Sequence, residues 1–285
     1  MLKAVRQAIP RLSAQEAVIA RRILVDPDLV LDSTAAELAT ASGTSPATVA
    51  RFSQHLGFSG YRQFRLACAA AVSRERAERD RFELHDEELS QDDNIDDVIA
   101  KILFQEVLAI EQTLRGLDRS IVTLVVDALL AARRIEITGF GASGLIAADL
   151  NEKLRRIGLL SSYSADLHFA LPSASTLVAG DVLVAFSHGG RTLETRNVLR
   201  VAQGSGATTV AISNDPGSPL AESADHTIVT RARERTFRTG AMASRSAQSS
   251  VADVLLVCVA QRNLATTSEA LRRTYDSILE HRTDP

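Results

Sequence analysis

Two short stretches of small and hydroxyl-bearing residues are the part of the sequence best suited to hold a ligand. They read Gly139-Phe-Gly-Ala-Ser-Gly144 and Ser187-His-Gly-Gly-Arg-Thr192, and each follows an apolar run. Glycine lets a backbone approach a ligand closely, and the free N–H groups at a helix start favour negative charge. Small hydroxyls complete a set of groups that suits a phosphate. We therefore predict a phosphate-binding site formed by Gly141, Ser143, Ser187, His188, Gly189, Gly190 and Thr192.

The glycine spacing of the first stretch leaves a second kind of ligand open. Gly139, Gly141 and Gly144 fit the G-x-G-x-x-G fingerprint of dinucleotide-binding proteins, which also requires an acidic residue about 20 positions later. Asp166 is the nearest acidic candidate. A dinucleotide-binding unit has no use for the second stretch of serine, glycine and threonine. A phosphorylated small molecule is therefore the favoured ligand.

Charged side chains near these stretches raise the question of catalysis. An enzyme acting by proton transfer would need a carboxylate or a histidine within reach of its substrate, and Glu152, His168 and Glu194 are the candidates. Side chains of these types are more often surface or helix-pairing residues. His188 and Arg191 could add positive charge beside a phosphate, or they could lie at the mouth of the site and in solvent. We assign no catalytic residue.

Both stretches need a framework of strands and helices to bring them together. From residue 134 onward, short β-branched runs alternate with helical ones, which predicts an α/β fold with a parallel sheet covered on both faces. Ligands in such sheets bind beyond the carboxyl ends of the strands, where both stretches are expected. The expected strands are 134–138, 159–163, 181–186, 207–213 and 226–230. The expected helices are 95–114, 119–132, 144–157, 166–174, 192–204, 217–222 and 247–260.

The beginning of the sequence has the spacing of a helix-turn-helix. A helix is expected over 34–42, Gly43 supplies the turn, and Ser45 with Pro46 starts the next helix. Val49 can then fill the wedge between the two helices, which leaves an outer face for DNA bases and phosphates. We predict that this face carries Ser45, Ala47, Thr48, Arg51, Gln54 and His55. A pair of solvated amphipathic helices without a ligand is the alternative.

The formal net charge of −3 is divided unevenly along the chain. Residues 1–81 hold 12 Lys and Arg against 8 Asp and Glu, whereas residues 82–118 hold 2 against 11. This division predicts a small domain over 1–81, which holds the helix-turn-helix, a solvated acidic linker over 82–94 and a larger domain over 95–285, which holds the two ligand stretches. The acidic segment could equally be the exposed start of a helix.

Composition limits the compartment and the cofactors. No apolar run approaches the roughly 20 residues of a membrane span, and the amino terminus lacks the order of a secretory signal, so we expect a cytoplasmic protein with no membrane partner. Cys68 and Cys258 lie far apart in apolar helical patterns, which suits neither a disulfide nor a zinc site. We expect both to be packing residues, and we expect no metal and no cofactor.

These stretches resemble one family. Residues 45–64, SPATVARFSQHLGFSGYRQF, look like the helix-turn-helix end of the RpiR-type transcriptional regulators. The two small-residue stretches, together with RTGAMASRSAQ at 238–248, look like their sugar isomerase (SIS) domain. The resemblance spans nearly the whole chain. It implies an all-helical head joined to a three-layer SIS domain with a five-stranded parallel sheet, which binds a phosphosugar effector and forms a homodimer or tetramer.

The same resemblance implies a double-stranded DNA operator and a phosphorylated sugar as partners, and carbohydrate metabolism as the regulated process. In the family the second loop usually reads Ser-x-Ser-Gly-x-Thr, with hydroxyls around the phosphate. Ser143, Ser187 and Thr192 keep their hydroxyls here, but Gly189 replaces the second serine of that pattern. A backbone donor remains at this position while one hydroxyl is lost.

Two other functions stay open at this point. One is a sugar-phosphate isomerase with a helical appendage, although such an enzyme has no use for an exposed face with Arg51 and Gln54. The other is a phosphosugar sensor that acts through protein contacts, which would bind the effector without binding an operator.

Overall fold

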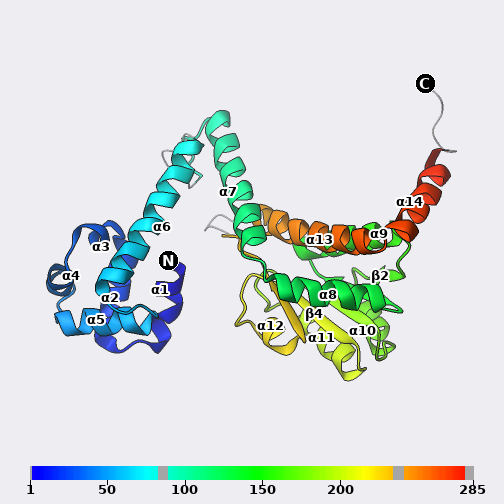
Figure 1. Ribbon diagram of the computed structural model, residues 1–285, viewed down its shortest axis with the longest axis horizontal. Helices are drawn as coiled ribbons and strands as arrows, with labels where there is room; N and C mark the ends of the chain where they lie inside the picture. The colour runs from blue at the N-terminus through cyan, green and yellow to red at the C-terminus, as the bar shows by residue number, and fades with distance from the viewer. Residues whose placement is uncertain (1, 83–88, 234–240, 280–285) are drawn as a thin grey trace. The chain divides into compact units, whose positions relative to one another are not determined.

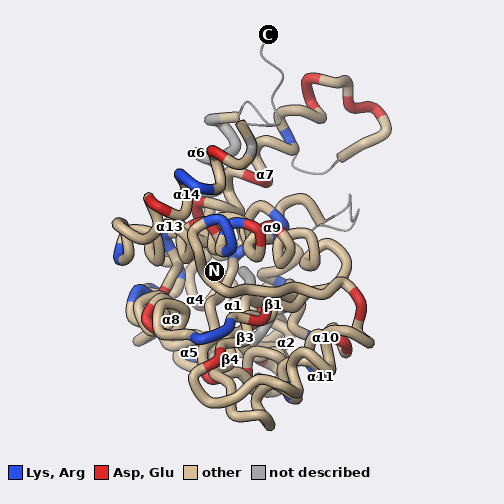
Figure 2. Tube along the Cα trace, turned by 90° about the vertical axis from the view of Figure 1, so that its right-hand side faces the viewer, with Lys and Arg blue, Asp and Glu red and all other residues tan. Residues whose placement is uncertain are grey.

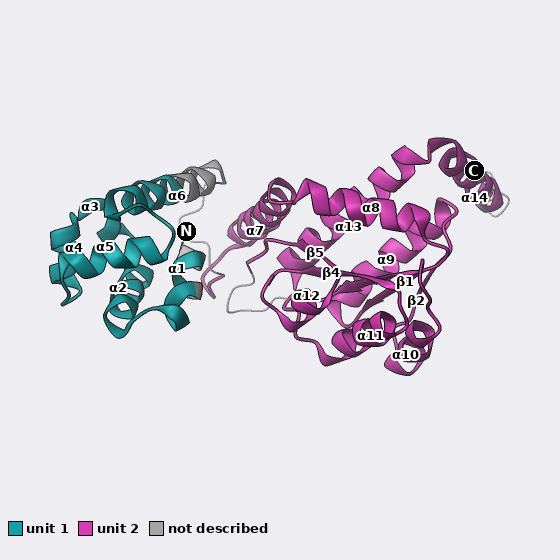
Figure 3. Ribbon diagram, turned by 60° about the horizontal axis from the view of Figure 1, so that its bottom comes forward, with its two compact units in different colours: residues 1–87 teal, residues 88–285 magenta. Residues whose placement is uncertain are grey.

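The computed structural model describes residues 2–82, 89–233 and 241–279 of the 285-residue chain. The chain divides into two compact units, residues 1–87 and 88–285, which Figure 3 draws in different colours. Part of the predicted acidic linker and the start of the motif at 238–248 lie outside the described residues.

The helices of the first unit begin where the sequence supplies caps. The Ser13 hydroxyl accepts a hydrogen bond from the Glu16 N–H, and the Glu16 carboxylate accepts one from the Ser13 N–H, so a capping box opens α2. Thr34 and Glu37 form the same box at the start of α4. The elements in order are α1 (Leu2–Ala8), η1 (Ile9–Arg11), α2 (Ala14–Val25), α3 (Asp28–Asp32), α4 (Ala35–Ala41), α5 (Pro46–His55) and α6 (Tyr61–Arg81), as Figure 1 shows.

The core of the first unit fixes the relation of α4, α5 and α6. Val49 and Phe52 on α5 are fully buried, which for Val49 agrees with its predicted place between the two helices. The ring of Phe52 meets that of Phe64 on α6 edge to face, with 5.5 Å between centroids, and Phe58 contacts the same ring at 5.5 Å. The Tyr61 hydroxyl donates a hydrogen bond of 2.9 Å to the Ser33 carbonyl oxygen. These contacts hold the helix-turn-helix in place against α6.

The second unit is built on a five-stranded parallel sheet with the strand order β2-β1-β3-β4-β5. All five strands correspond to predicted ones, and the predicted α/β class is confirmed. The strands are β1 (Ile135–Gly139), β2 (Ser161–Tyr163), β3 (Val182–Phe186), β4 (Thr208–Ser213) and β5 (His226–Val229).

Helices cover both faces of this sheet and give three layers (Figure 1). One apolar cluster joins the sheet to α8, α9 and α13, and a second cluster joins its other face to α10, α11 and α12. The helices are α7 (Ile95–Arg115), α8 (Arg119–Ala131), α9 (Ala142–Arg156), α10 (Leu167–Ser175), α11 (Leu193–Gly204), α12 (Pro219–Ser223), α13 (Met242–Arg262) and α14 (Leu264–Leu279).

The end of the acidic segment folds against α7. The Asp93 carboxylate lies 2.7 Å from the Lys101 ammonium, and both side chains are largely buried. Asn94 then caps the helix by accepting hydrogen bonds from the N–H groups of Asp96 and Asp97. Figure 2 marks the acidic residues of this region in red. The last residues before α7 are therefore anchored to it.

The cysteines pack as expected. Cys68 is buried in the core of the first unit, and burial raises the pKa of its thiol to about 11. Cys258 is partly buried against the core of the second unit. Among the described residues, no group of His, Cys, Asp and Glu is arranged to hold a metal ion. In the same residues, no helix has the length and apolar character needed to cross a bilayer.

Candidate anion site and candidate nucleic-acid interface

The two predicted phosphate loops begin side by side. β1 and β3 are neighbours in the sheet, and Gly139 at the end of β1 pairs in register with Phe186 at the end of β3. From β1 the chain crosses to β2 on one side, whereas β3 is followed by β4 on the other side. The two loops therefore flank the point at which the strand order reverses, where parallel sheets bind ligands.

The first loop needs its glycines for space and for backbone shape. Gly141 precedes α9 with φ of 59° and ψ of −132°, a conformation suited to glycine. A Cβ at Gly139 would lie 2.9 Å from the Ser143 carbonyl oxygen, and one at Gly144 would lie 2.7 Å from the Tyr163 hydroxyl. Ser143 lies in the first turn of α9. The loop thus brings bare backbone and one hydroxyl to the rim of the sheet.

The second loop brings two hydroxyls together. Ser187 is buried, and its Oγ donates a hydrogen bond of 3.2 Å to Oγ1 of Thr192. The Gly190 N–H donates to the Ser187 carbonyl oxygen at 3.1 Å, which closes the turn between them. Gly190 has φ of 61°, and a Cβ on it would collide with the Ser218 side chain. Gly189 is exposed, and nothing lies within 4 Å of the position of an added Cβ.

The helices that follow these loops start without a side-chain cap. Gly141 at α9 and Thr192 at α11 accept no hydrogen bond from the helix through a side chain, and the same holds for Ala241 at α13. Side chains do cap four other helices of the second unit: α7, α8, α10 and α12. The N–H groups of a first turn need partners, and the dipole makes an anion favourable there. The rim therefore suits a negatively charged group.

Charged side chains lie around this rim rather than in its centre. Arg191 is exposed and pairs with Asp215 at 3.2 Å. His188 is half-buried, and its carbonyl oxygen accepts hydrogen bonds from the Asn214 N–H at 2.8 Å and the Ser213 hydroxyl at 3.2 Å. Asp166, the acidic residue after β2, accepts a hydrogen bond from the His168 N–H and so caps α10. This structural role explains its presence without a dinucleotide ligand.

The three acid or base candidates are exposed side chains. Glu152 lies 11 residues after Gly141 on α9, roughly 16 Å along the helix from the loop, and it pairs with Arg155 at 4.0 Å. Glu194 and His168 are exposed on the first turns of α11 and α10. Glu152 is thus too distant to exchange a proton at the rim.

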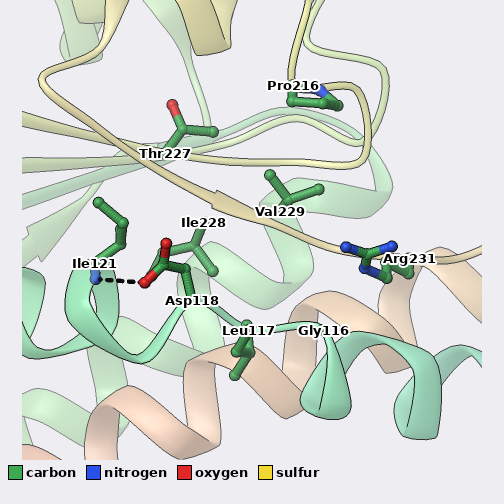
Figure 4. A pocket seen from close by; sticks show the side chains of 9 residues that line it. All are labelled: Gly116, Leu117, Asp118, Ile121, Pro216, Thr227, Ile228, Val229 and Arg231. Carbon is green, nitrogen blue, oxygen red and sulfur yellow. Dashed lines mark hydrogen bonds between the residues drawn. The ribbon is translucent and has the colours of Figure 1, made fainter. Parts of the chain in front are cut away.

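A separate cavity of about 360 Å³ lies beside the edge strand β5. Figure 4 shows it between the turn that joins α7 to α8 and the loop after β4. Leu117 and Asp118 come from the turn, Pro216 from the loop, and Arg231 from the segment after β5. The Asp118 carboxylate is occupied in capping α8, because it accepts hydrogen bonds from the N–H groups of Ser120 and Ile121.

Five of the six predicted DNA-binding residues are exposed on or beside α5: Ser45, Ala47, Arg51, Gln54 and His55. The predicted outward position of Thr48 is wrong, because Thr48 is only 1% exposed. Its hydroxyl lies 2.9 Å from Ser45 Oγ and donates a hydrogen bond of 3.4 Å to Gln15 Oε1 on α2. α5 is covered by α2 as well as by α4, so a second side of the helix is buried. Thr48 therefore positions the helix.

A contact between a carboxylate and an imidazole also fixes the end of α5. Oε1 of Glu16 on α2 lies 2.9 Å from Nδ1 of His55. Burial opposes ionisation of Glu16, but hydrogen bonds from Ser13 and the contact with His55 outweigh it and lower the pKa of the carboxyl. Among the charged residues Lys, Arg, Asp and Glu, α5 carries Arg51 alone.

The loop after β4 supports the site and was not predicted. Ser213 and Asn214 hold the His188 carbonyl oxygen, and Ser218 packs beneath Gly190. The available signal was the turn-rich segment SNDPGS at 213–218, which ends a third strand at the same edge of the sheet. This segment has no charge pattern that would have indicated a ligand, so its supporting role was not predicted.

Comparison with known proteins agrees with this arrangement. Residues 1–75 match the family described as "Helix-turn-helix domain, rpiR family", and residues 128–258 match the SIS domain. A protein of Caldanaerobacter subterraneus subsp. tengcongensis is 34% identical over 278 residues, which cover 95% of this chain and 96% of that protein. A Haemophilus influenzae protein is 31% identical over 271 residues, 95% of this chain and 93% of its own. Both are named as uncharacterized HTH-type transcriptional regulators.

A solved structure is similar over the full length. The NanR protein of Vibrio vulnificus, complexed with ManNAc-6P, aligns over 99% of both chains with a TM-score of 0.63 and 26% identity. The sugar isomerase domain of an RpiR transcription factor from Sphaerobacter thermophilus covers 63% of this chain and 98% of its own, with a TM-score of 0.57 and 21% identity, and shows the same fold.

Proposed function

This chain belongs to the rpiR family of helix-turn-helix transcriptional regulators with a SIS domain, and on that premise we propose that a phosphorylated sugar controls its binding to an operator. Relatives that match 95% of its length are named regulators, so its role is regulatory and not enzymatic. The observation that carries the proposal is the pair of uncapped helices, α9 and α11, that start beside the adjoining hydroxyls of Ser187 and Thr192.

The effector's phosphate is held by hydroxyls and backbone N–H groups. Ser187 and Thr192 donate from the second loop, Ser143 donates from the first, and the glycine backbone at Gly141, Gly189 and Gly190, with the backbone of His188 between them, allows close approach. The bound ligand of the Vibrio vulnificus protein, ManNAc-6P, supports a phosphorylated sugar as the ligand class for this rim. The regulated process is then carbohydrate metabolism in the cytoplasm.

The DNA contacts come from the exposed face of α5. Arg51 and Gln54 are long enough to reach base edges in the major groove, and Ser45, Ala47 and His55 lie at the two ends of the same face. Residues 1–81 are the DNA-binding domain, residues 82–94 the linker and residues 95–285 the phosphosugar-binding domain. A dimer would present two such helices to the half-sites of an inverted repeat.

The proposal is tested by separating the two functions with variants of the full chain. The operator is the duplex that the wild-type protein selects from random DNA, and the effector is found by thermal shift against hexose, pentose and amino-sugar phosphates. A ligand that binds only the folded state at 100 times its Kd stabilises it by about 2.7 kcal/mol. Ser187→Ala combined with Thr192→Ala should abolish this shift and leave operator binding intact. Arg51→Ala should keep the shift and weaken operator binding.

A matched control uses a Ser/Thr pair at the end of α10. Ser175 and Thr176 also form local hydrogen bonds, and they precede β3, at the opposite end of the strand from Ser187. Ser175→Ala with Thr176→Ala should preserve both functions. The proposal is wrong if no sugar phosphate shifts the wild-type protein, or if the shift survives loss of Ser187 and Thr192. Turnover of a sugar phosphate by the wild-type protein would instead support the isomerase alternative.

A further inference from the structure

The carbonyl oxygen of His188 is held by a residue of another loop. It accepts a hydrogen bond of 2.8 Å from the Asn214 N–H and one of 3.2 Å from the Ser213 hydroxyl. His188 lies between Ser187 and Gly189 of the proposed phosphate loop. Any shift of that loop around a bound phosphate therefore acts directly on the backbone of Asn214.

The side chain of Asn214 reaches in a different direction. Its Oδ1 accepts a hydrogen bond of 2.7 Å from the N–H of Ala232, which is a buried residue after β5. The preceding N–H, that of Arg231, donates a hydrogen bond of 2.8 Å to Oγ1 of Thr113. Thr113 is fully buried near the end of α7. Three hydrogen bonds thus lead from the phosphate loop to α7.

The segments joined by these three hydrogen bonds also pack closely against one another. The Arg231 side chain covers Gly116 so closely that an added Cβ there would collide with it. The cavity of Figure 4 is lined by both Pro216, two residues after Asn214, and the turn that begins at Gly116. The loop after β4 and the turn that follows α7 therefore border the same small space, together with β5.

α7 is the element that continues the chain toward the first unit. It has 21 residues, so it is a rod of about 30 Å that starts directly after the acidic segment. The ion pair of Asp93 and Lys101 fastens the end of that segment to the helix. A displacement applied near Thr113 is therefore passed along a rigid helix to the linker.

We propose that Asn214 is a positioning residue that couples the occupied phosphate loop to α7 and, through it, to operator affinity. The inference rests on the proposed function, since it presupposes both an effector and an operator. Coupling requires the link to differ between the effector-bound and the free state. Asn214 contacts the loop through its backbone and the β5 extension through its side chain, so the side chain can be removed without deleting the contact to His188.

The test measures the coupling factor, which is the operator Kd with effector divided by the operator Kd without it. Couplings are typically about 5- to 150-fold in either direction. The probe is the sugar phosphate that gives the largest thermal shift, and the protein is the full chain. Asn214→Ala and Thr113→Val should each bring the factor to within about twofold of unity, with effector affinity changed by less than about fivefold.

Conservative variants show whether the hydrogen bonds themselves matter. Asn214→Asp keeps the Oδ acceptor and Thr113→Ser keeps the hydroxyl, so both should retain the wild-type factor. Asn263→Ala, at the end of α13, is the control of the same residue type. A merely structural role would lower effector affinity or melting temperature while the factor stays unchanged.

The possible failures are distinct. If the wild-type protein binds effector and operator with no coupling, the proposed function and this inference both fail. If the wild-type factor is large and persists in Asn214→Ala and in Thr113→Val, this inference alone is overturned. A loss in only one of the two variants also contradicts a single connected link, because each variant breaks the same chain of hydrogen bonds.

Discussion

Glu16 and His55 join α2 to the end of α5, with 2.9 Å between Oε1 of Glu16 and Nδ1 of His55. Glu16 also closes the capping box with Ser13, so one buried carboxylate fixes both the start of α2 and the end of α5. The lowered pKa of Glu16 means that its charged form is favoured by folding.

This contact predicts acid sensitivity of the first unit. A carboxyl whose pKa is lowered on folding stabilises the protein fully above its ordinary value of 4.5, and the contribution is lost as the pH falls through the lower folded value. Glu16→Gln should reduce the free energy of unfolding by about 1 kcal/mol at pH 7. Urea unfolding of the full chain, followed by circular dichroism, should show this difference shrinking below about pH 4.5. A difference independent of pH would contradict the role of the charge.

Thr48 and Arg51 lie on the same helix and should behave differently. Thr48→Val removes a buried hydroxyl with two partners, so it should destabilise the first unit by about 1–2 kcal/mol. Arg51→Ala removes an exposed side chain, so it should leave the melting temperature unchanged and weaken operator binding by about 1–3 kcal/mol. Anisotropy titration with the selected operator, paired with thermal melts, distinguishes them. Equal loss of stability in both variants would mean that Arg51 is a structural residue.

Gly190 and Gly189 are adjacent, but only Gly189 has room for a side chain. Gly190→Ala places a side chain against Ser218 in a left-handed backbone, so it should abolish the effector-induced thermal shift and destabilise the second unit by about 1–3 kcal/mol. An added Cβ at Gly189 meets no protein atom, so Gly189→Ala should leave the stability of the second unit unchanged and is the matched control for stability. Retention of the full thermal shift in Gly190→Ala would show that the shape of this turn is not required.

Gly189→Ser should strengthen effector binding. The position is open, and the family pattern has a serine there, so a third hydroxyl can join those of Ser187 and Thr192 at the phosphate. One additional hydrogen bond to a charged group contributes about 1.5–3 kcal/mol. Isothermal titration with the sugar phosphate should show at least a several-fold lower Kd. Unchanged affinity would indicate that the phosphate lies away from residue 189.

Asp93 and Lys101 predict that the end of the acidic segment stabilises α7. Asp93→Ala removes the carboxylate from a largely buried ammonium, which should accelerate amide exchange in the first turns of α7 on the order of tenfold. The double variant Asp93→Leu with Lys101→Met replaces the pair by apolar side chains and should restore protection. Hydrogen–deuterium exchange of the full chain tests both variants. Unaltered exchange in Asp93→Ala would show that Asp93 does not anchor the segment to α7.

Much of the fold follows from local pattern. The strands of the sheet were predicted because short β-branched runs stand between turn-forming residues, as at β3 before Ser187. α14 was missed because Asn263 alone separates it from α13 and no glycine or proline marks the junction. α13 begins earlier than predicted for a similar reason, since small residues such as Ala243 and Ser244 do not reveal which side of a helix is buried.

The sites could be predicted only in part. Each proposed phosphate loop is one contiguous stretch of sequence, so its residue types and spacing are enough to propose Ser187 and Thr192. Thr48 is buried because α2 packs on α5, and its partner Gln15 on α2 is 33 residues earlier in the chain. A helix pattern read with one buried face does not show that a second helix covers another side. Asn214 was missed for the same reason, because its partners belong to separate loops and are brought together only by the parallel sheet.

The interlocked rings of Phe52, Phe58 and Phe64 have a consequence for how such a regulator can respond. Because Phe64 of α6 contacts both Phe52 of α5 and Phe58 just after it, α5 cannot roll about its own axis without moving α6, so the order of its side chains toward the groove should be the same at every effector concentration. The effector would then change how often the protein occupies its operator and not which base sequence it prefers. Selection of DNA sites in the presence and absence of the sugar should return one consensus.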